Sequence, residues 1–340
     1  MPSPISISDT LIITLPETLS SWPWKRHINP HYESCKVESA EWLESLNAFG
    51  PNAQRAFDKC NFGLLAALVY PLLDKDGCRL GCDLMNLLFL FDEHTDAGNA
   101  EMVRAQVDIV MDAIYNSSTP RPQNEWIGGK GTQQILLRFW QNMIKCATSL
   151  CQHRFINTLQ IYLDGVVQQA ADRSVNHVRD IDSYFALRRA SSGIRPALAI
   201  CELYLNIPNS VMAHPVIEKL TELAVDMIFI DNDTVSYKVE RERGDDGHNL
   251  VTVVMNQLRV GPQMAFDYIS DLYNSKEAQF LEAWKNIPTY EGALDLDVRT
   301  YCYGLGNWVR GNNSWDFETE RYLGERGLEV QTTRKVEIKI

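Results

Sequence analysis

Two apolar segments, each followed by a cluster of acidic residues, constrain the fold of this chain more than any other feature. Residues 84–91 read LMNLLFLF and lead into DEHTD at 92–96, and residues 223–230 read LAVDMIFI and lead into DND at 231–233. A helix that is apolar on nearly all sides belongs inside a larger fold. Carboxylates gathered at the end of such a helix repel one another unless water or cations reach them. The simplest common explanation is one apolar cavity with an acidic, metal-binding rim.

The rest of the chain has mainly a helical hydrophobic period, broken by Gly and Pro, so we predict an all-α fold in one domain over residues 1–325. Residues 1–35 are rich in Pro and Trp and are expected to form an extended capping segment. Residues 326–340 are expected to be a mobile tail, with the chain's one hint of a strand. Helices are predicted near 37–48, 52–59, 61–70, 78–95, 99–116, 131–148, 151–173, 180–189, 194–205, 211–240, 248–257, 260–285 and 295–312.

Composition excludes several classes of function. The 340 residues carry 44 acids against 32 bases, a net charge of −12, so no basic footprint for a nucleic acid is present. The eight cysteines are scattered and form no C-x-x-C pair, which favours reduced thiols, and no H-E-x-x-H zinc motif is present. We expect no signal peptide and no membrane span, and therefore a cytoplasmic protein.

Two sets of oxygen ligands stand at helical spacing. Asp92 and Asp96 are four residues apart and so share one helix face, and hard oxygen ligands of this kind suit Mg²⁺. Asn232, Ser236 and Glu240 follow the second apolar segment at positions i, i+4 and i+8. Each set alone could be a solvated helix end or a polar helix face. The two together, each after a buried apolar run, favour two metal-binding walls around one cavity.

Basic and aromatic residues complete the predicted site. The paired arginines at 188–189 precede Ser192 and Gly193 and offer a fork for phosphate oxygens, although two surface arginines would look the same. Arg321 and Tyr322 follow an aromatic segment at 308–315. Side chains one turn before the acidic residues should line the apolar part of the cavity. They are Met85, Leu88, Phe89, Val225, Ile228 and Phe229.

Taken in order, these motifs resemble those of class I terpene synthases, and most of all the basidiomycete type of fungal sesquiterpene synthase. The motifs are DEHTD at 92–96, NDTVSYKVE at 232–240, Arg189 with Gly193, and Arg321-Tyr322. NPHYE at 29–33 and the residues from 242 to 250 support the resemblance, which covers residues 20–322. It implies the helical bundle of that family, with one deep central apolar pocket.

The resemblance also implies roles for single residues. Three Mg²⁺ ions, replaceable by Mn²⁺, would be held by Asp92, Asp96, Asn232, Ser236 and Glu240. Arg189, Arg321 and Tyr322 would bind the diphosphate of the substrate. Ser192 and Gly193 would form the helix break that couples diphosphate binding to ionisation, and Phe89 and Trp315 would face the carbocation.

Two positions depart from the family pattern. Position 93 is Glu where Asp is frequent, which leaves the metal chelate intact. Many family members carry Lys immediately before the last metal-binding Glu, but here Val239 occupies that place and Lys238 comes one residue earlier. A direct contact between Lys238 and diphosphate is therefore in doubt.

The activity that the resemblance implies is that of a carbon–oxygen lyase in fungal secondary metabolism. It would ionise farnesyl diphosphate, cyclise the carbocation to a sesquiterpene hydrocarbon or alcohol, and release diphosphate. A non-catalytic helical protein that binds prenyl diphosphates is the alternative, but both ligand sets are intact. The second aspartate-rich motif of chain-elongating prenyltransferases and the D-x-D-D of class II cyclases are absent from the sequence. Product skeleton, minor use of geranyl diphosphate, and monomer or homodimer stay open.

Overall fold

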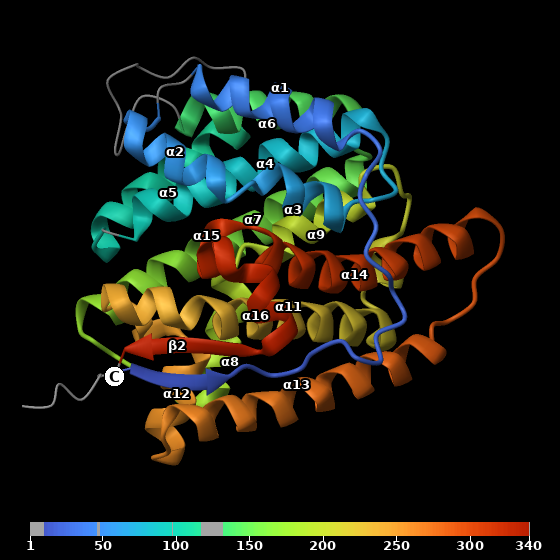
Figure 1. Ribbon diagram of the computed structural model, residues 1–340. Helices are drawn as coiled ribbons and strands as arrows, with labels where there is room; N and C mark the ends of the chain where they lie inside the picture. Colours follow the sequence, from blue (N-terminus) through green and yellow to red (C-terminus); the bar gives the residue numbers. More distant parts are fainter. Residues whose placement is uncertain (1–9, 46–47, 97, 117–131, 340) are drawn as a thin grey trace, which may run out of the picture.

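The structure is a computed structural model that describes residues 10–45, 48–96, 98–116 and 132–339 (Figure 1). It confirms the all-α prediction. The elements are β1 (Thr10–Thr14), α1 (Tyr32–Glu44), α2 (Pro51–Lys59), α3 (Phe62–Val69), α4 (Lys75–Thr95), α5 (Ala100–Tyr115), α6 (Thr132–Cys146), α7 (Ser149–Ser174), α8 (Ile181–Ser191), α9 (Ile194–Leu198), η1 (Ala199–Glu202), α10 (Asn209–Met212), α11 (Pro215–Arg243), η2 (Asp246–His248), α12 (Leu250–Leu258), α13 (Pro262–Lys285), α14 (Ala293–Glu318), α15 (Glu320–Leu323), η3 (Gly324–Arg326), α16 (Gly327–Thr333) and β2 (Lys335–Lys339).

The long helices pack side by side around a common interior. Helix α11 packs against α13 and α14, α14 packs against α3, and α3 packs against α4, while α7 lies against α5 and α8 (Figure 1). The apolar segments predicted from the sequence lie in this interior. Residues 223–230 of α11 are buried throughout, and residues 84–91 of α4 are buried except for Leu88 and Phe89, which are half-buried. Those two side chains line a cavity, described below.

Local sequence signals set the helix boundaries close to their predicted places. Asp74 caps the start of α4 by accepting from the Gly77 N–H at 2.9 Å, and Thr148 and Asp180 cap α7 and α8 in the same way. Pro215 opens α11, where its missing N–H costs nothing. Gly244 ends that helix in the left-handed conformation, with φ of 79°.

The N-terminal segment covers α13 and α14, and the C-terminal segment joins it. Strand β1 pairs antiparallel with β2, from Thr10 opposite Lys339 to Thr14 opposite Lys335. Trp22 donates to the Gly306 carbonyl of α14 at 3.1 Å. Trp24 lies so close to Gly306 that a Cβ there would be 2.0 Å from the indole ring, so only glycine allows this approach. Residues 15–31 of the predicted capping segment thus form no long helix and pack closely against the bundle.

Several sequence predictions differ from the structure. Helix α1 begins at Tyr32, five residues before its predicted start, and so includes the end of the predicted capping segment. Helix α14 continues to Glu318, six residues beyond its predicted end, which places Trp315 on the helix. The helix predicted over 211–240 is divided, because Pro215 starts a new helix after α10. The tail expected at 326–340 contains α16 and β2, and β2 is anchored by its pairing with β1, so its mobility stays a prediction. Residues 1–9 of the capping segment and Ile340 lie outside the described residues.

Candidate active site

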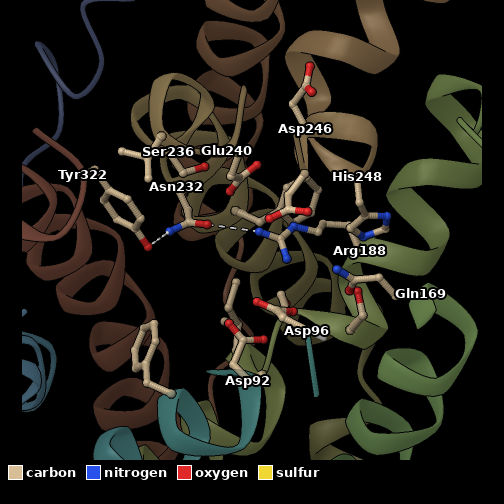
Figure 2. Close-up of a pocket in the computed structure, with 18 of the residues that line it drawn as sticks. Asp92, Asp96, Gln169, Arg188, Asn232, Ser236, Glu240, Asp246, His248 and Tyr322 are labelled. Atoms are coloured by element: carbon tan, nitrogen blue, oxygen red, sulfur yellow. Dashed lines mark hydrogen bonds between the residues drawn. The ribbon is translucent and has the colours of Figure 1, made fainter. Parts of the chain in front are cut away.

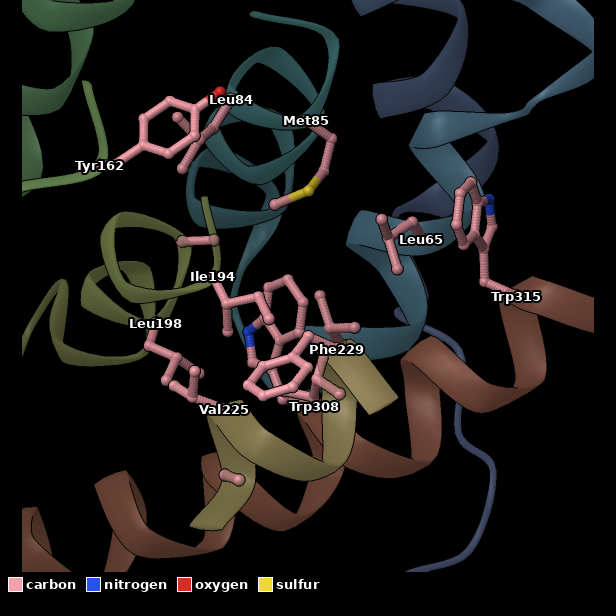
Figure 3. Close-up of a cluster of buried hydrophobic side chains, with 14 of the residues drawn as sticks. Leu65, Leu84, Met85, Tyr162, Ile194, Leu198, Val225, Phe229, Trp308 and Trp315 are labelled. Atoms are coloured by element: carbon pink, nitrogen blue, oxygen red, sulfur yellow. The ribbon is translucent and has the colours of Figure 1, made fainter. Parts of the chain in front are cut away.

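A cavity of about 510 Å³ opens between the helix ends. Its mouth is lined by charged and amide side chains and its inner part by apolar and aromatic ones (Figures 2 and 3). Eleven of the twelve site residues expected from the sequence line it: Phe89, Asp92, Asp96, Ser192, Gly193, Asn232, Ser236, Glu240, Trp315, Arg321 and Tyr322. The twelfth, Arg189, does not.

Asp92 and Asp96, at the C-terminal end of α4, form one wall of the mouth. Among the described residues no donor bonds the carboxylates of Asp92 and Asp96, and the nearest cation to Asp96 is Arg173, whose Nη1 is 3.9 Å from Oδ1. Burial raises the pKa of Asp92. Burial and then the charge of Asp92 raise the pKa of Asp96 to about 8. This wall is therefore short of positive charge.

The ligands of α11 form the opposite wall and are held by neighbours (Figure 2). Asn232 accepts from Nη2 of Arg188 at 3.0 Å and donates to the hydroxyl of Tyr322 at 2.7 Å. Asn249, which begins α12, donates both to Ser236 Oγ at 3.3 Å and to Glu240 Oε2 at 3.0 Å. One amide thus orients two of the three oxygen ligands.

The chemistry of these donors fits Mg²⁺. Both walls offer oxygen atoms only, and the described residues include no group of three or more His, Cys, Asp or Glu side chains arranged to hold a metal ion. Magnesium is commonly bound through one or two carboxylates plus substrate phosphates and water. Burial, and next the charge of Asp233, raise the pKa of Glu240 to about 7. A cation bound beside this carboxylate would favour its charged form.

The two adjacent arginines of α8 point to different places, and the sequence prediction chose the one outside the cavity. Arg188 lines the cavity and bonds Asp233 at 2.8 Å as well as Asn232. Arg189 forms a bidentate pair with the fully buried Asp226, at 2.7 and 2.8 Å. Consecutive helical residues lie about 100° apart, and the Arg-Arg pattern alone does not say which one faces inward. Of the two arginines, Arg188 is the one that lines the cavity.

The helix break after the arginines is present. Gly193 lies between α8 and α9 with φ of 69°, a left-handed conformation that favours glycine, and it lines the cavity beside Ser192. The hydroxyls of Ser191 and Ser192 are buried and have no partner among the described residues. Unbonded polar atoms at a break in a helix are costly, which is typical of a functional site.

The C-terminal helix α15 brings Arg321 and Tyr322 over the cavity. Arg321 bonds Glu93 at 2.8 Å, and its guanidinium lies 5.4 Å from the centre of the Phe89 ring. Trp315 is fully buried beneath, 5.8 Å from Phe89 and 5.8 Å from Tyr322 between ring centres. These four side chains connect α4, α14 and α15 on one side of the mouth.

The inner part of the cavity is apolar. Met85, Leu65, Ile194, Phe229 and Trp308 surround it (Figure 3). Val225, which we expected to line the cavity, belongs to the buried cluster around it but does not line it. Such a wall excludes water and offers aromatic faces to a cation.

Several cavity residues escaped the sequence analysis, because their motifs are single residues at loop or helix ends. Arg173 of α7 donates to the carbonyls of Thr95 and Gly98, and so fixes the end of α4 at the acidic wall. Arg243, one turn after Glu240, lines the cavity, whereas Lys238 does not. Gln169, Asp246 and His248 also reach the mouth (Figure 2). Arg243 thus brings a positive charge to the cavity lining, and Lys238 does not.

Comparison with known proteins identifies the class to which this site belongs. The family model described as "Terpene synthase family 2, C-terminal metal binding" matches residues 83–279. This stretch contains both oxygen-ligand walls, and the chain belongs to this terpene synthase family. It is an enzyme of the sesquiterpene cyclase type, as the resemblance implied.

Individual relatives cover nearly the whole chain. A Delta(6)-protoilludene synthase of Hypholoma sublateritium is 59% identical, over 98% of this chain and 97% of its own length. Others of the same name, from Stereum hirsutum and Armillaria gallica, are 50% and 49% identical over 95% and 94% of this chain, and 86% and 91% of their own lengths.

Solved structures confirm the fold. That of a-eudesmol synthase has a TM-score of 0.78 at 19% identity and covers 89% of this chain and 99% of its own. That of germacradien-4-ol synthase from Streptomyces citricolor has a TM-score of 0.75 at 22% identity, over 92% and 100%. No helix in the described part of the chain is long and apolar enough to cross a membrane.

Proposed function

We propose that this protein converts farnesyl diphosphate into Δ6-protoilludene and diphosphate in a reaction that requires Mg²⁺. The observation that carries the proposal is the cavity itself, with two oxygen-ligand walls facing each other at the mouth of an apolar chamber. The shared name of relatives up to 59% identical supports the product.

The mouth is built to take a diphosphate with its metal ions. Asp92 and Asp96 on one wall, and Asn232, Ser236 and Glu240 on the other, would hold magnesium ions, and three are expected from the family resemblance. Bound Mg²⁺ supplies the positive charge that makes diphosphate a good leaving group. The acidic walls alone would repel the substrate, so cations have to accompany it.

Arg188 is the residue of this chain best placed to meet the departing diphosphate. Its guanidinium now bonds Asn232 and Asp233, and the Asn232 oxygen is also a proposed metal ligand. If a metal ion took up that oxygen, Nη2 of Arg188 would be free to bond a phosphate oxygen. Arg321 faces the mouth from the opposite side and gives a second positive charge. Both arginines therefore stabilise charge that grows as the carbon–oxygen bond breaks.

The inner chamber then protects and folds the allylic cation. Tyr322 and Arg321 lie over the mouth, and the apolar wall leaves little room for water once the farnesyl chain is bound. Trp308, Trp315 and Phe229 present aromatic surface to the cation, each worth about 2 kcal/mol when desolvated. The reaction ends when a carbon of the cyclised cation loses a proton.

Incubation of the purified protein with farnesyl diphosphate and Mg²⁺, followed by gas chromatography with mass spectrometry, tests the proposal. We expect Δ6-protoilludene as the main product, with Mn²⁺ as a partial substitute for Mg²⁺ and no turnover in excess EDTA. Geranyl diphosphate offered in parallel shows how strictly the chamber selects chain length. Binding of farnesyl diphosphate without any product would favour the non-catalytic alternative, and another skeleton would refute the product assignment alone.

A further inference from the structure

Helix α14 places an amide in the aromatic wall of the chamber. Asn312 lines the cavity one turn after Trp308 and three residues before Trp315, both of which line it too. Its side chain is buried, as is the rest of this stretch of α14. Burying a polar group in an apolar wall costs free energy unless the group forms a favourable interaction there.

The orientation of that amide is set from behind. Nδ2 of Asn312 donates to Oδ2 of Asp316 at 2.9 Å, one turn further along α14. No described residue donates to Oδ1 of Asn312. Because the nitrogen end is engaged by Asp316, the carbonyl oxygen is the end left for the cavity. A carbonyl oxygen attracts positive charge, whereas the NH₂ end would repel it.

Asp316 has no evident structural purpose apart from this bond. It is fully buried, and its Oδ1 has no partner among the described residues. Burial, and next the charge of the nearby Asp231, raise the pKa of Asp316 well above its usual range. A buried carboxyl with an unbonded oxygen next to a second carboxyl destabilises a fold, and an apolar residue would fit there at less cost.

We propose that Asn312 is a specificity-determining residue whose carbonyl oxygen stabilises positive charge on the part of the cyclising intermediate that lies against α14. Asp316 acts through it as a positioning residue that keeps the amide nitrogen turned away from the chamber. This inference rests on the proposed function and deepens it. It assigns to α14 a single polar contact that favours late carbocations over early loss of a proton.

Four variants test both parts of the inference by product analysis. Asn312→Leu keeps the volume and removes the dipole, so the ratio of the main product to early-quenched acyclic and monocyclic products should fall roughly fivefold, the effect of one hydrogen-bond-strength interaction. Asp316→Leu should shift the ratio in the same direction, because the amide can then rotate. Asp316→Asn retains an acceptor oxygen and should restore the wild-type ratio. Ser314→Ala is the matched control, since Ser314 is buried on α14 and its hydroxyl bonds, among the residues that the structure describes, only the Arg310 carbonyl, at 3.0 Å.

Melting temperature and total Mg²⁺-dependent consumption of farnesyl diphosphate show whether each variant is folded and can ionise substrate. If Asn312→Leu does not fold, Asn312→Ala takes its place with the same expected shift. An unchanged product ratio in a folded, active position-312 variant would overturn the inference. A shifted ratio in Asp316→Asn, equal to that in Asp316→Leu, would overturn the positioning role of Asp316. Failure of the wild-type protein to convert farnesyl diphosphate would refute the proposed function instead.

Discussion

The two oxygen-ligand walls of the cavity are built in opposite ways. On α11 the ligands extend from the middle of a long helix to its last turn. Arg188 and Asn249 donate hydrogen bonds to them, and Asn232 donates to the Tyr322 hydroxyl. On α4 the carboxylates of Asp92 and Asp96 come at the C-terminal end of the helix, without a donor among the described residues. The negative end of the helix dipole adds to their repulsion.

This difference indicates that the α11 wall is organised before any cation arrives, whereas the α4 wall needs one. Arg188 bonds Asn232, and Asn249 bonds Ser236 and Glu240, so hydrogen bonds fix the positions of the α11 ligands. Arg173, the nearest cation to Asp96, mainly bonds backbone carbonyls of the α4 end. We therefore expect metal binding to stabilise the α4 wall more than the α11 wall.

The sharpest test of this contrast compares Asp92→Ala with Asn232→Ala. Both should lower turnover by at least roughly 10²–10³-fold, because each removes electrostatic stabilisation of the leaving diphosphate. The metal-free melting temperatures should differ. Asp92→Ala relieves repulsion and should leave the temperature equal or higher, while Asn232→Ala loses the bonds to Tyr322 and Arg188 and should lower it. A lower melting temperature for Asp92→Ala, measured by calorimetry in EDTA, would contradict the contrast.

The paired arginines give the next largest effect. Arg188→Lys keeps the charge but loses the planar fork that bonds Asn232 and Asp233, so we expect kcat to fall roughly 10–100-fold with the product pattern unchanged. Arg189→Lys disturbs the bidentate pair with Asp226, outside the cavity, and should lower the melting temperature with a much smaller effect on kcat. Steady-state kinetics and melting curves of both variants decide between them. A larger loss of kcat in Arg189→Lys would return the site role to Arg189.

Arg188 and Arg189 also show which features can be predicted from the sequence alone. Hydrophobic period and helix-ending residues predicted the long helices, and spacing at i, i+4 and i+8 placed three ligands on one face of α11. Those inferences are local, because the geometry of one helix decides them. Which of two adjacent arginines faces inward depends on how α8 is rotated against α11, and that is set by the buried Asp226 and by packing.

The other site residues that were not predicted from the sequence depend on tertiary contacts in the same way. Asn249 bonds Glu240, 9 residues earlier in the chain, and Arg173 bonds the carbonyl of Thr95, the residue before Asp96, 78 residues earlier. The pairing of β1 with β2 joins the two ends of the chain and left only a hint in the tail sequence. Contacts of this kind exist only after folding, and single-sequence patterns carry no signal for them.

The acidic walls also predict how stability depends on pH. The pKa of Glu240 is raised to about 7 and that of Asp96 to about 8, so the folded state holds protons that the unfolded chain releases near pH 4. In the metal-free protein the contribution of these two groups to stability should therefore be greatest below about pH 4, the unfolded pKa. It should be lost as the pH rises from there through 7 to 8. Mg²⁺ with inorganic diphosphate should flatten this slope, since metal ions need the deprotonated ligands.

Melting temperatures measured from pH 5 to 8.5, with and without Mg²⁺ and diphosphate, check the slope. Buried carboxyls away from the cavity contribute to the slope as well. Burial raises the pKa of Glu202, which pairs with Arg154, to about 7, and that of Asp231 to about 6. Glu202→Gln should reduce the slope by the same amount with and without Mg²⁺ and diphosphate. A metal-free slope that rises with pH would show that the carboxylates of the walls are already compensated.

The smallest expected effect concerns the aromatic side of the mouth, where the α4 wall meets the chamber. Phe89 lies one turn before Asp92, stacks on Phe62 at 3.9 Å between ring centres, and carries the Arg321 guanidinium over its ring. Phe89→Leu keeps the wall apolar but removes the aromatic face. We expect ionisation to continue at a moderately reduced rate, while part of the product shifts to acyclic and monocyclic terpenes.

Two readouts separate the possible roles of Phe89. Gas chromatography reports the product ratio, and the KM for farnesyl diphosphate reports whether Arg321 still binds the diphosphate without the ring beneath it. A raised KM with an unchanged product ratio would mean that Phe89 only supports Arg321, so that its position on the unsupported α4 wall matters for substrate binding and not for the cation. A changed ratio at constant KM would mean that the ring faces the cation. If neither the product ratio nor the KM changed, Phe89 would be an ordinary core residue. The side chains that face the cation would then be those of α14, Trp308 and Trp315.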